Sequence, residues 1–403
     1  MIVLAVNCGS SSLKFQALDV GTGDESRRLA KGQVERIGGD AVFGVEMTGR
    51  APLRETAAIA DHEKAVRRVV EWVRESGLHL EAVGHRVVHG GDRYTRPTVL
   101  DAAIDAAIES LEALAPLHNG PNLAGIRGCR AALGPAMPMV AVFDTAFHAT
   151  MPEHVYRYAI PHDVAERHGL RRFGFHGISY QFVLARYCRL AGVAESEATL
   201  IAMHLGNGAS AVAIQNGRSL DTSMGFTPLE GLVMGSRSGD LDPALVGQIA
   251  RLEGVSVDQV EQWLNERSGL LGLSGRSRDM RDLIERRNDD ARARLAVDVF
   301  CYRAKKYVGA YLAALGGARA VVFTGGIGEH APEVRAAICD GMAWCGLELD
   351  AERNAGARGS ESLISAPAAR LQAWVIPTDE ELVIAQETAR CLAARPGLPP
   401  VRE

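Results

Sequence analysis

Two short segments that lie far apart in the chain repeat one design: an apolar strand, a turn of small polar residues and a second strand. The first runs over residues 2–17, with the turn Asn7–Ser12, and the second over residues 200–214, with the turn His204–Ser210. Glycine and other small residues let a backbone approach a bulky anion and direct its N–H groups at it. The repeat predicts a duplicated, two-domain protein that handles phosphate, although each segment alone is also compatible with an ordinary hairpin.

Composition limits the class of protein. At 403 residues the chain is long enough for two domains with full cores. Its residues are 47% hydrophobic and 23% charged, and its net charge is −5. The dispersed basic residues argue against a nucleic-acid partner, and the sequence has neither an 18-residue apolar run nor a signal-peptide pattern. Seven scattered cysteines without a CxxC pair predict neither a disulfide framework nor a zinc site. We expect a cytoplasmic protein that does not bind a membrane.

Strands alternate with helices along the chain, which is typical of an α/β fold. Hydrophobic spacing predicts helices over 61–76, 101–114 and 291–315, and strands over 82–88, 138–143, 320–324 and 373–376. The loop-rich segment 145–180 is expected to form an active-site wall. Residues 350–370 are expected to form a loose excursion.

The segment Val321–Val334 carries a second kind of nucleotide signal, a strand followed by a glycine turn and a helix. The start of a helix offers N–H groups and the positive end of its dipole to an anion. The pattern is neither GxGxxG nor a Walker A loop, which disfavours a dehydrogenase and a P-loop NTPase. A tight turn without a ligand remains open.

Two arginines lie in glycine-rich contexts, Arg86 at a strand end and Arg237 in a loop. A guanidinium offers two parallel donors that suit a carboxylate or a phosphate. Asp144 follows an apolar strand and His176 lies between Phe175 and Gly177, so both are candidate acid–base or electrostatic groups. The alternatives are surface ion pairs for the arginines, a helix N-cap for Asp144 and a core histidine for His176.

Eight motifs, in order along nearly the whole chain, resemble the acetate kinase family. They are Asn7–Lys14, His85–Gly91, Phe143–His148, Phe173–Gly177, His204–Gly208, Asp221–Asp240, Gly326–Glu329 and Glu380–Leu382. The resemblance implies the duplicated two-domain actin-like ATPase (ribonuclease H-like) α/β fold, with βββαβαβα cores facing across a cleft. It implies an N-terminal domain of residues 1–147 plus 382–403 on the acyl-substrate and metal side. A second domain, 148–381, is implied on the nucleotide side, with the interface of a homodimer.

The resemblance also implies the reaction, ATP + acetate ⇌ ADP + acetyl phosphate, with Mg²⁺ (or Mn²⁺) and a role in acetyl-CoA biosynthesis. It assigns catalysis to Asp144, His176 and Arg237, and the metal to Asn7 and Glu380. It assigns acetate to Arg86, with an apolar pocket of Val88, Leu117, Phe175 and Pro228. The implied nucleotide contacts are Lys14, His204, Leu205, Gly206, Asn207, Gly208, Asp279, Met280, Arg281, Gly326, Ile327, Gly328, Glu329 and His330.

The chemistry agrees with these roles. Acetate is ionised at pH 7, so the difficulty is to bring one anion to another, and Mg²⁺ and two arginines would offset that repulsion. We expect Asp144 to orient the metal, its water or an arginine rather than to take a proton.

Some residues depart from the family pattern: His330, Asp379, Gly120, Ile178 and Tyr180. His330 puts the nucleotide preference in question and Asp379 the metal affinity. A propionate or butyrate kinase on the same fold remains open, although the branched Val88 favours a short acyl chain. A non-catalytic nucleotide-binding module is a further alternative.

Overall fold

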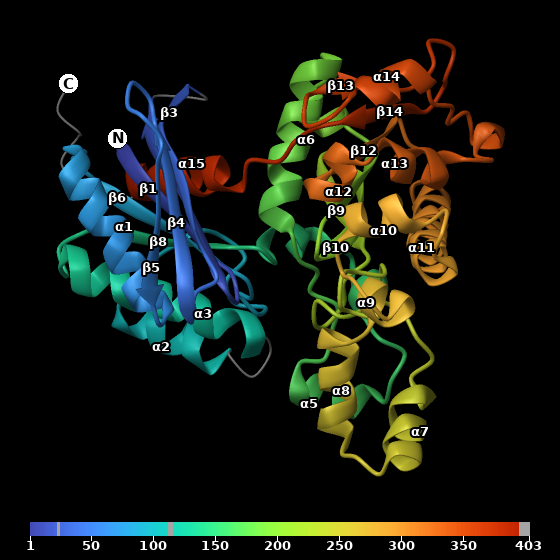
Figure 1. Cartoon of the computed structure of the whole chain (residues 1–403), viewed down its shortest axis with the longest axis horizontal. Helices are drawn as coiled ribbons and strands as arrows, with labels where there is room; N and C mark the ends of the chain where they lie inside the picture. Colours follow the sequence, from blue (N-terminus) through green and yellow to red (C-terminus); the bar gives the residue numbers. More distant parts are fainter. Residues whose placement is uncertain (22–24, 112–115, 395–403) are drawn as a thin grey trace. The chain divides into compact units, whose positions relative to one another are not determined.

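A computed structural model describes residues 1–21, 25–111 and 116–394, with only the backbone of residues 116–118. The chain divides into two compact units. Unit 1 is Met1–Ala146 with Asp379–Glu403, and unit 2 is Phe147–Thr378. Each unit contains a mixed β-sheet with helices packed on it (Figure 1).

The sheet of unit 1 has the strand order β5-β4-β3-β2-β1-β6-β8-β7. Its strands are β1 Ile2–Cys8, β2 Ser12–Val20, β3 Ser26–Glu35, β4 Gly39–Met47, β5 Leu53–Ile59, β6 Ala82–Val87, β7 Thr98–Val99 and β8 Met139–Phe143. β1 to β5 form an antiparallel meander, whereas β1, β6 and β8 run parallel. All five residues of β8 are buried, as expected for a parallel strand that is covered on both faces.

The helices of unit 1 are α1 His62–Ser76, α2 Ala102–Ser110, α3 Pro116–Leu133 and α15 Glu380–Ala393. Two close approaches fix α3 and α15 on the sheet. A Cβ on Gly125 of α3 would lie 2.6 Å from Cys8 Sγ, and a Cβ on Gly84 of β6 would lie 2.3 Å from Thr388 Oγ1 of α15. Figure 1 shows α15, from the end of the chain, beside the first strands.

The sheet of unit 2 has the order β11-β10-β9-β12-β14-β13. Its strands are β9 Leu200–Leu205, β10 Ala209–Gln215, β11 Arg218–Thr222, β12 Ala320–Thr324, β13 Ser362–Leu363 and β14 Gln372–Val375. β9, β10 and β11 form an antiparallel meander, and β9, β12 and β14 run parallel. This sheet repeats the pattern of unit 1, an antiparallel meander that continues into parallel strands, so the α/β fold is duplicated.

The helices of unit 2 are α4 Glu153–Tyr156, α5 His162–His168, α6 Gly177–Ala191, α7 Ala244–Glu253, α8 Val257–Glu266, α9 Gly269–Ser274, α10 Met280–Arg286, α11 Ala291–Leu315, α12 Gly325–His330, α13 Pro332–Cys339 and α14 Ala351–Gly356. The long α11 is capped by Asp290 and ends at the left-handed Gly316, which explains its sharp limits. α6 packs Tyr180, Val183 and Leu184 into a core with β9 and β10. None of the described helices is both long and apolar enough to cross a membrane.

Two local predictions are wrong. The segment 350–370 contains α14 and β13 rather than a loose excursion. The reason is Arg335 of α13, fully buried, which donates to Asn354 Oδ1, to the carbonyls of Asn354 and Ala357, and to the Gly328 carbonyl. In addition, the glycines after β12 form the helix α12 from Gly325 rather than a turn, whereas the helix expected after them is observed as α13.

The segment 145–180 is less irregular than its residues suggested. It holds a 3₁₀ helix (Ala146–Thr150), α4, α5 and the start of α6. The predicted helix 101–114 is observed as α2 up to Ser110, and its residues 112–114 lie outside the described part of the chain.

Candidate functional site

In unit 1, four predicted site residues lie at strand ends or at the start of a helix. Asn7 lies near the end of β1 and Arg86 near the end of β6, Asp144 follows β8, and α15 begins at Glu380. β1, β6 and β8 are parallel neighbours, so their carboxyl ends meet at one edge of the sheet. That edge is where open α/β sheets bind ligands.

Hydrogen bonds join these four side chains. Arg86 Nη2 donates to Asp144 Oδ2 at 2.6 Å, and Arg86 Nη1 donates to Asn7 Oδ1 at 3.1 Å. Asn7 Nδ2 donates to Glu380 Oε2 at 2.9 Å. The Nε–H of Arg86 is also buried, and no acceptor for it lies within the described residues. The guanidinium is therefore held on two sides, and its Nε–H is a donor left for another group.

The charge of Arg86 is stabilised by its neighbours. Burial opposes this charge, but Asp144, Glu380 and Glu381 outweigh burial and raise the pKa of the guanidinium. The Asp144 side chain is fully buried and that of Arg86 is 15% exposed. A buried pair of this kind specifies geometry, since either partner alone would be an uncompensated charge. Asp144 therefore fixes the position of the Arg86 guanidinium, and its role in the reaction stays a prediction.

Sequence reasoning missed Gln16 and Glu381, which support this group. Gln16 Nε2 donates to Asp379 Oδ1 at 2.8 Å and to Glu381 Oε2 at 3.4 Å. Asp379 also accepts from the backbone N–H of Leu382 at 3.2 Å and caps α15. An aspartate directly before a helix is a standard N-cap, so the departure at Asp379 has a local structural use. That signal was available in the sequence.

The loop after β6 is fixed by two asparagines of α3. Asn122 Oδ1 accepts from the Val88 N–H at 2.9 Å and its Nδ2 donates to the Cys8 carbonyl at 2.7 Å. Asn119 Oδ1 accepts from the His89 N–H at 3.1 Å. Val88 is buried. The side chain of the predicted pocket residue Leu117 lies outside the described residues.

Lys14 pairs with Asn7 across the β1–β2 ladder, and its side chain is exposed. Directly opposite residues of an antiparallel pair share one face of the sheet. Lys14 and Asn7 therefore project from the same face.

In unit 2, His176 and His204 stack beside the glycine turn that follows β9. Their ring centroids are 4.2 Å apart and the ring planes differ by 22°. A Cβ on Gly208 would lie 3.4 Å from His176 Nε2, and a Cβ on Gly206 would lie 3.7 Å from His204 Nε2. Both Nε2 atoms therefore face the turn. His176 has a φ of 59°, a strained value that is frequent in functional sites.

Arg237 lies at the same turn. A Cβ on Gly208 would be 3.8 Å from Arg237 Nη1, and Arg237 Nη1 donates to the carbonyl of the buried Pro228 at 3.2 Å. The Gly235 N–H donates to the Asn207 carbonyl at 2.9 Å, which fastens the arginine loop to the turn. His176, Arg237 and Gly208 thus meet at a point where glycine leaves room for a ligand.

α12 packs against the same turn. A Cβ on Gly325 would lie 2.8 Å from the Leu205 carbonyl oxygen, and a Cβ on Gly328 would lie 3.6 Å from Leu205 Cβ. Glu329 Oε1 accepts from the N–H groups of Gly325 and Thr378, at 2.9 and 3.2 Å. Glu329 therefore fixes the backbone at this junction, a role that its motif alone did not specify.

The remaining predicted nucleotide residues differ in their exposure. Asp279 caps α10 and pairs with the exposed Arg281 at 2.7 Å, whereas Met280 is buried. Gly326 and His330 are exposed and Ile327 is half-buried. Phe175 is buried, and its carbonyl binds His148 Nε2 at 3.0 Å.

Four hydroxyl groups around the histidines were also missed. Ser210 Oγ lies 2.8 Å from His176 Nδ1 and also binds the Tyr180 hydroxyl. Ser179 Oγ lies 2.9 Å from His204 Nδ1 and donates to Thr378 Oγ1 at 2.9 Å. The sequence held one signal, the unusual Tyr180 after the His176 motif.

No group of three or more His, Cys, Asp or Glu side chains converges as a metal site among the residues that the structure describes. A site for Mg²⁺ needs less, because this ion keeps several waters and binds through one or two carboxylates and the phosphates of its substrate. The amide oxygen of Asn7 and the carboxylate of Glu380 are hard oxygen donors, and the Asn7 amide nitrogen Nδ2 donates to Glu380 Oε2. These residues fit the ion.

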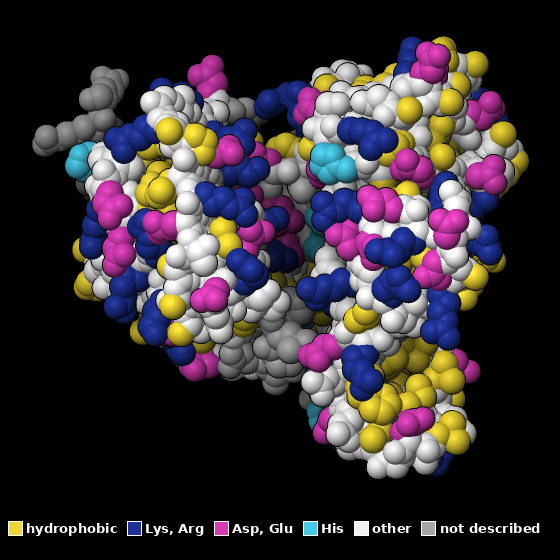
Figure 2. All heavy atoms as spheres, viewed as in Figure 1, with side chains coloured by type: hydrophobic (Ala, Val, Ile, Leu, Met, Phe, Trp, Pro, Cys, Tyr) yellow, Lys and Arg dark blue, Asp and Glu magenta, His cyan; other side chains and the backbone are white. Residues whose placement is uncertain are grey.

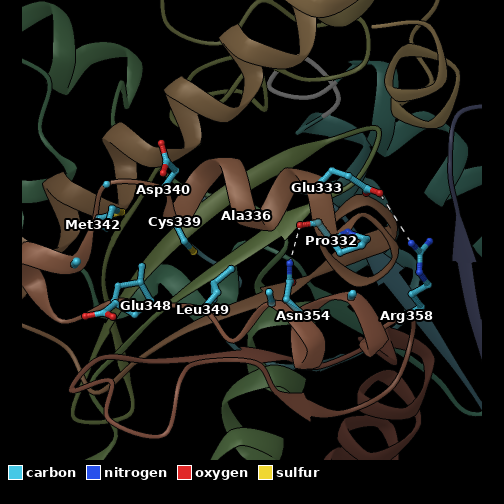
Figure 3. A pocket seen from close by; sticks show the side chains of 15 residues that line it. Pro332, Glu333, Ala336, Cys339, Asp340, Met342, Glu348, Leu349, Asn354 and Arg358 are labelled. Carbon is cyan, nitrogen blue, oxygen red and sulfur yellow. Dashed lines mark hydrogen bonds and ion pairs between the residues drawn. The ribbon is translucent and has the colours of Figure 1, made fainter. Parts of the chain in front are cut away.

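A separate hollow in unit 2 lies between α13 and α14 (Figure 3). Glu333 and Arg358 pair across its rim at 4.0 Å, and Asn354 Nδ2 donates to the Pro332 carbonyl. The described residues that line it include none of the predicted site residues. The predicted site residues of unit 2 therefore lie outside this hollow.

Comparisons with known proteins find relatives along nearly the whole chain. The model of the acetokinase family matches residues 2–386. The acetate kinase of Solibacter usitatus is 51% identical over 98% of this chain and 99% of its own length, and that of Chloroherpeton thalassium is 48% identical over 97% and 99%.

Solved structures also match this chain over nearly its whole length. The Porphyromonas gingivalis acetate kinase has a TM-score of 0.88 and 41% identity, with 97% of this chain and 99% of the other covered. A propionate kinase from Francisella tularensis has a TM-score of 0.90 and 37% identity, with 96% and 99% covered.

Proposed function

Because the chain belongs to the acetokinase family, we propose that it transfers the γ-phosphoryl group of ATP to acetate, reversibly, to give acetyl phosphate and ADP. One observation of the structure carries the choice of a carboxylate as acceptor. The buried Nε–H of Arg86 has no acceptor within the described residues, although both Nη atoms donate to Asn7 and Asp144.

A buried donor without an acceptor costs about 1–3 kcal/mol. A small carboxylate would satisfy that donor and balance the guanidinium charge, and charge-assisted bonds of this type are the strong ones. The neighbouring Val88 is buried and branched, which supports its assignment to the methyl group of a short acid. The other pocket assignments, to Leu117, Phe175 and Pro228, rest on the family motifs.

The nucleotide is assigned to unit 2. The point beside Gly208 lies within 4 Å of His176 Nε2 and Arg237 Nη1, and two donors around a glycine suit a phosphate oxygen. We therefore propose that His176 and Arg237 hold the γ-phosphoryl group as negative charge spreads over its oxygens. The contacts of Asp279–Arg281 and Gly326–His330 with the adenosine, and that of Lys14 with the phosphates, are part of the same proposal.

The chemistry needs no general base. An acetate oxygen forms the new bond to the γ-phosphorus while the bond from that phosphorus to the bridging oxygen breaks, and ADP leaves with the electron pair. Such transfers depend on positioning and electrostatics. Asp144 already binds Arg86 at 2.6 Å, so its role is to orient that guanidinium rather than to accept a proton.

Asn7 and Glu380 would hold Mg²⁺, and Mn²⁺ has the same preference for hard oxygen ligands. The bound ion would neutralise phosphate charge. In this arrangement Glu381 orients Asn7, because it accepts from Asn7 Nδ2, and Gln16 in turn donates to Glu381.

Propionate is the second candidate substrate, since the Francisella propionate kinase matches this chain over nearly its full length. One methylene in an apolar pocket changes binding by only about 1–3 kcal/mol. The proposal is therefore a preference for acetate and not an exclusion of propionate.

The test is acyl phosphate formation from ATP and Mg²⁺, trapped with hydroxylamine, across formate, acetate, propionate and butyrate. We expect the highest kcat/KM with acetate, and a loss of at least about 100-fold in the Arg86→Ala variant. Arg127→Ala, which removes an exposed ion pair of α3 with Glu109, is the control. A higher kcat/KM with propionate than with acetate would make propionate the substrate. The absence of acyl phosphate with all four acids would refute the proposed function.

We also propose a homodimer formed through unit 2. α7 has no buried residue, and Leu245, Leu252 and Val257 of α7 and α8 are 46%, 72% and 53% exposed. Figure 2 shows hydrophobic side chains gathered over this part of unit 2, and such patches often mark protein interfaces. Sedimentation equilibrium should give twice the mass of the chain.

A cytoplasmic location completes the proposal, because the ATP that the reaction uses is abundant there.

A further inference from the structure

The stacked histidines His176 and His204 are bound by hydroxyl groups in a way that bears on where their protons lie. Each ring turns Nε2 toward the glycine turn and Nδ1 toward a serine. A neutral imidazole has one donor and one acceptor nitrogen, so the group bound to Nδ1 decides what Nε2 can do.

The His204 side is settled by the serine that it contacts. Ser179 Oγ donates to Thr378 Oγ1 at 2.9 Å, which uses its one proton. The 2.9 Å contact between Ser179 Oγ and His204 Nδ1 must then be donated by the histidine. His204 accordingly carries a proton on Nδ1, and its Nε2 is an acceptor when the ring is neutral.

The serine that contacts His176 has a different second partner, a phenol hydroxyl. Ser210 Oγ lies 2.8 Å from His176 Nδ1 and binds the hydroxyl of Tyr180, and both residues are fully buried. A phenol is a stronger acid than an aliphatic alcohol, so Tyr180 is the better donor of the two. When Tyr180 donates to Ser210, the serine proton is directed to His176 Nδ1.

We propose that Tyr180 and Ser210 are positioning residues that hold His176 as the Nε2–H tautomer, with its donor facing the phosphate position beside Gly208. The inference rests on the proposed phosphoryl transfer for its functional meaning, but not for the proton position itself. His176 is the catalytic residue, and the two hydroxyl groups act through it.

The stacking supports this assignment. The two rings are nearly parallel at 4.2 Å, with both Nε2 atoms on the side of the turn. Opposite tautomers then place the two ring dipoles antiparallel, which is attractive at this distance, whereas identical tautomers would align them and repel. Since His204 carries its proton on Nδ1, the favourable partner is His176 with its proton on Nε2.

The consequence is a pair of donors at one point. A Cβ on Gly208 would lie 3.4 Å from His176 Nε2 and 3.8 Å from Arg237 Nη1. The other tautomer would present a lone pair to a phosphate oxygen there and would repel it.

The experiment is nitrogen NMR of the full-length protein labelled with ¹⁵N-histidine, without substrates, with His176 assigned by comparison with a His176→Gln variant. Long-range couplings from the ring hydrogens distinguish a protonated from an unprotonated ring nitrogen. The wild type, Tyr180→Phe and Ser210→Ala are compared. The control is Tyr187→Phe, because Tyr187 lies on the same helix, is 2% exposed and belongs to the same core.

We expect an unprotonated Nδ1 for His176 in the wild type and in the control. Tyr180→Phe and Ser210→Ala should both raise the Nδ1–H population. In the acyl phosphate assay both should lower kcat about three- to tenfold, the value of one or two hydrogen bonds, with the KM for acetate unchanged. The control should keep the wild-type kcat.

A protonated Nδ1 in wild-type His176, or the same tautomer in wild type and both variants, would overturn the proposal. If Tyr180→Phe does not fold, Ser210→Ala tests the same proton position on its own. Failure of the proposed function would look different, because the wild type would then form no acyl phosphate while the tautomer result would stand.

Discussion

Replacing Asp144 by asparagine tests how the anion site is built. The carboxylate is fully buried and accepts from Arg86 Nη2 at 2.6 Å. At an effective dielectric constant of about 20, a charge pair some 4 Å apart is worth roughly 4 kcal/mol. Asparagine keeps one acceptor oxygen but removes the charge, and Glu380 and Glu381 still act on the guanidinium. We therefore expect a destabilisation of about 3 kcal/mol, at the lower end of the range for a broken buried pair.

The same change should lower kcat/KM for acetate about 100-fold. The reason is that Arg86 would lose about 3 kcal/mol of the interaction that holds its guanidinium in place, and such a loss in the transition state corresponds to that factor. The assay is hydroxamate formation at varied acetate and Mg²⁺, with urea unfolding in parallel. Asp105→Asn is the matched control, since it weakens a partly exposed pair with Arg130 in the same unit, and it should lose less than about 1 kcal/mol. Normal turnover and normal Mg²⁺ dependence in Asp144→Asn would refute the reasoning.

Three further changes test other parts of the account. Burial, together with Arg130, lowers the pKa of His85 from 6.5 to about 3. The free energy of unfolding that the neutral ring contributes is therefore fully present above pH 6.5 and is lost as the pH falls toward 3. When the pH falls from 7 to 5, the free energy of unfolding in urea should therefore drop by about 2 kcal/mol less in His85→Gln than in the wild type. A change of the exposed His79 to glutamine is the control and should leave this pH dependence as in the wild type. The same pH dependence in both variants would contradict the reasoning. A Cβ on Gly235 would lie 2.1 Å from an oxygen of the turn residue Asn207, so Gly235→Ala should raise the KM for ATP about tenfold and leave that for acetate unchanged, and an unchanged KM for ATP would count against the turn as the nucleotide site. Arg335→Lys cannot reach all four acceptors of the buried guanidinium and should destabilise by about 3 kcal/mol; a loss below about 1 kcal/mol in urea unfolding would contradict the assigned role.

Elements with strong local signals were predicted well. The periodic α11 was placed at its observed limits, 291–315, and the apolar runs gave β8 and β12 within a residue. β4 and β5 were missed because glycine and charged residues interrupt them, so they lack the apolar runs on which the other strand predictions relied. α14 was missed because its order comes from Arg335, a contact from another helix that composition does not reveal.

The site shows the same limit. The motifs brought Asn7, Arg86, Asp144 and Glu380 together, because each lies at the end of a strand or the start of a helix. Gln16 was missed because its partners lie 363 and 365 residues away in the chain. Hydroxyl groups that act on a neighbouring side chain leave no periodic pattern, so apart from Tyr180 nothing in the sequence indicated them.

The most direct measurement of the central claim is phosphorus NMR of the protein with ATP, Mg²⁺ and acetate. The account predicts that acetyl phosphate and ADP appear at equal rates as the γ-phosphate signal of ATP decays, and that this exchange is lost in Arg86→Ala. Release of inorganic phosphate without acetyl phosphate, or equal transfer in Arg86→Ala, would contradict it.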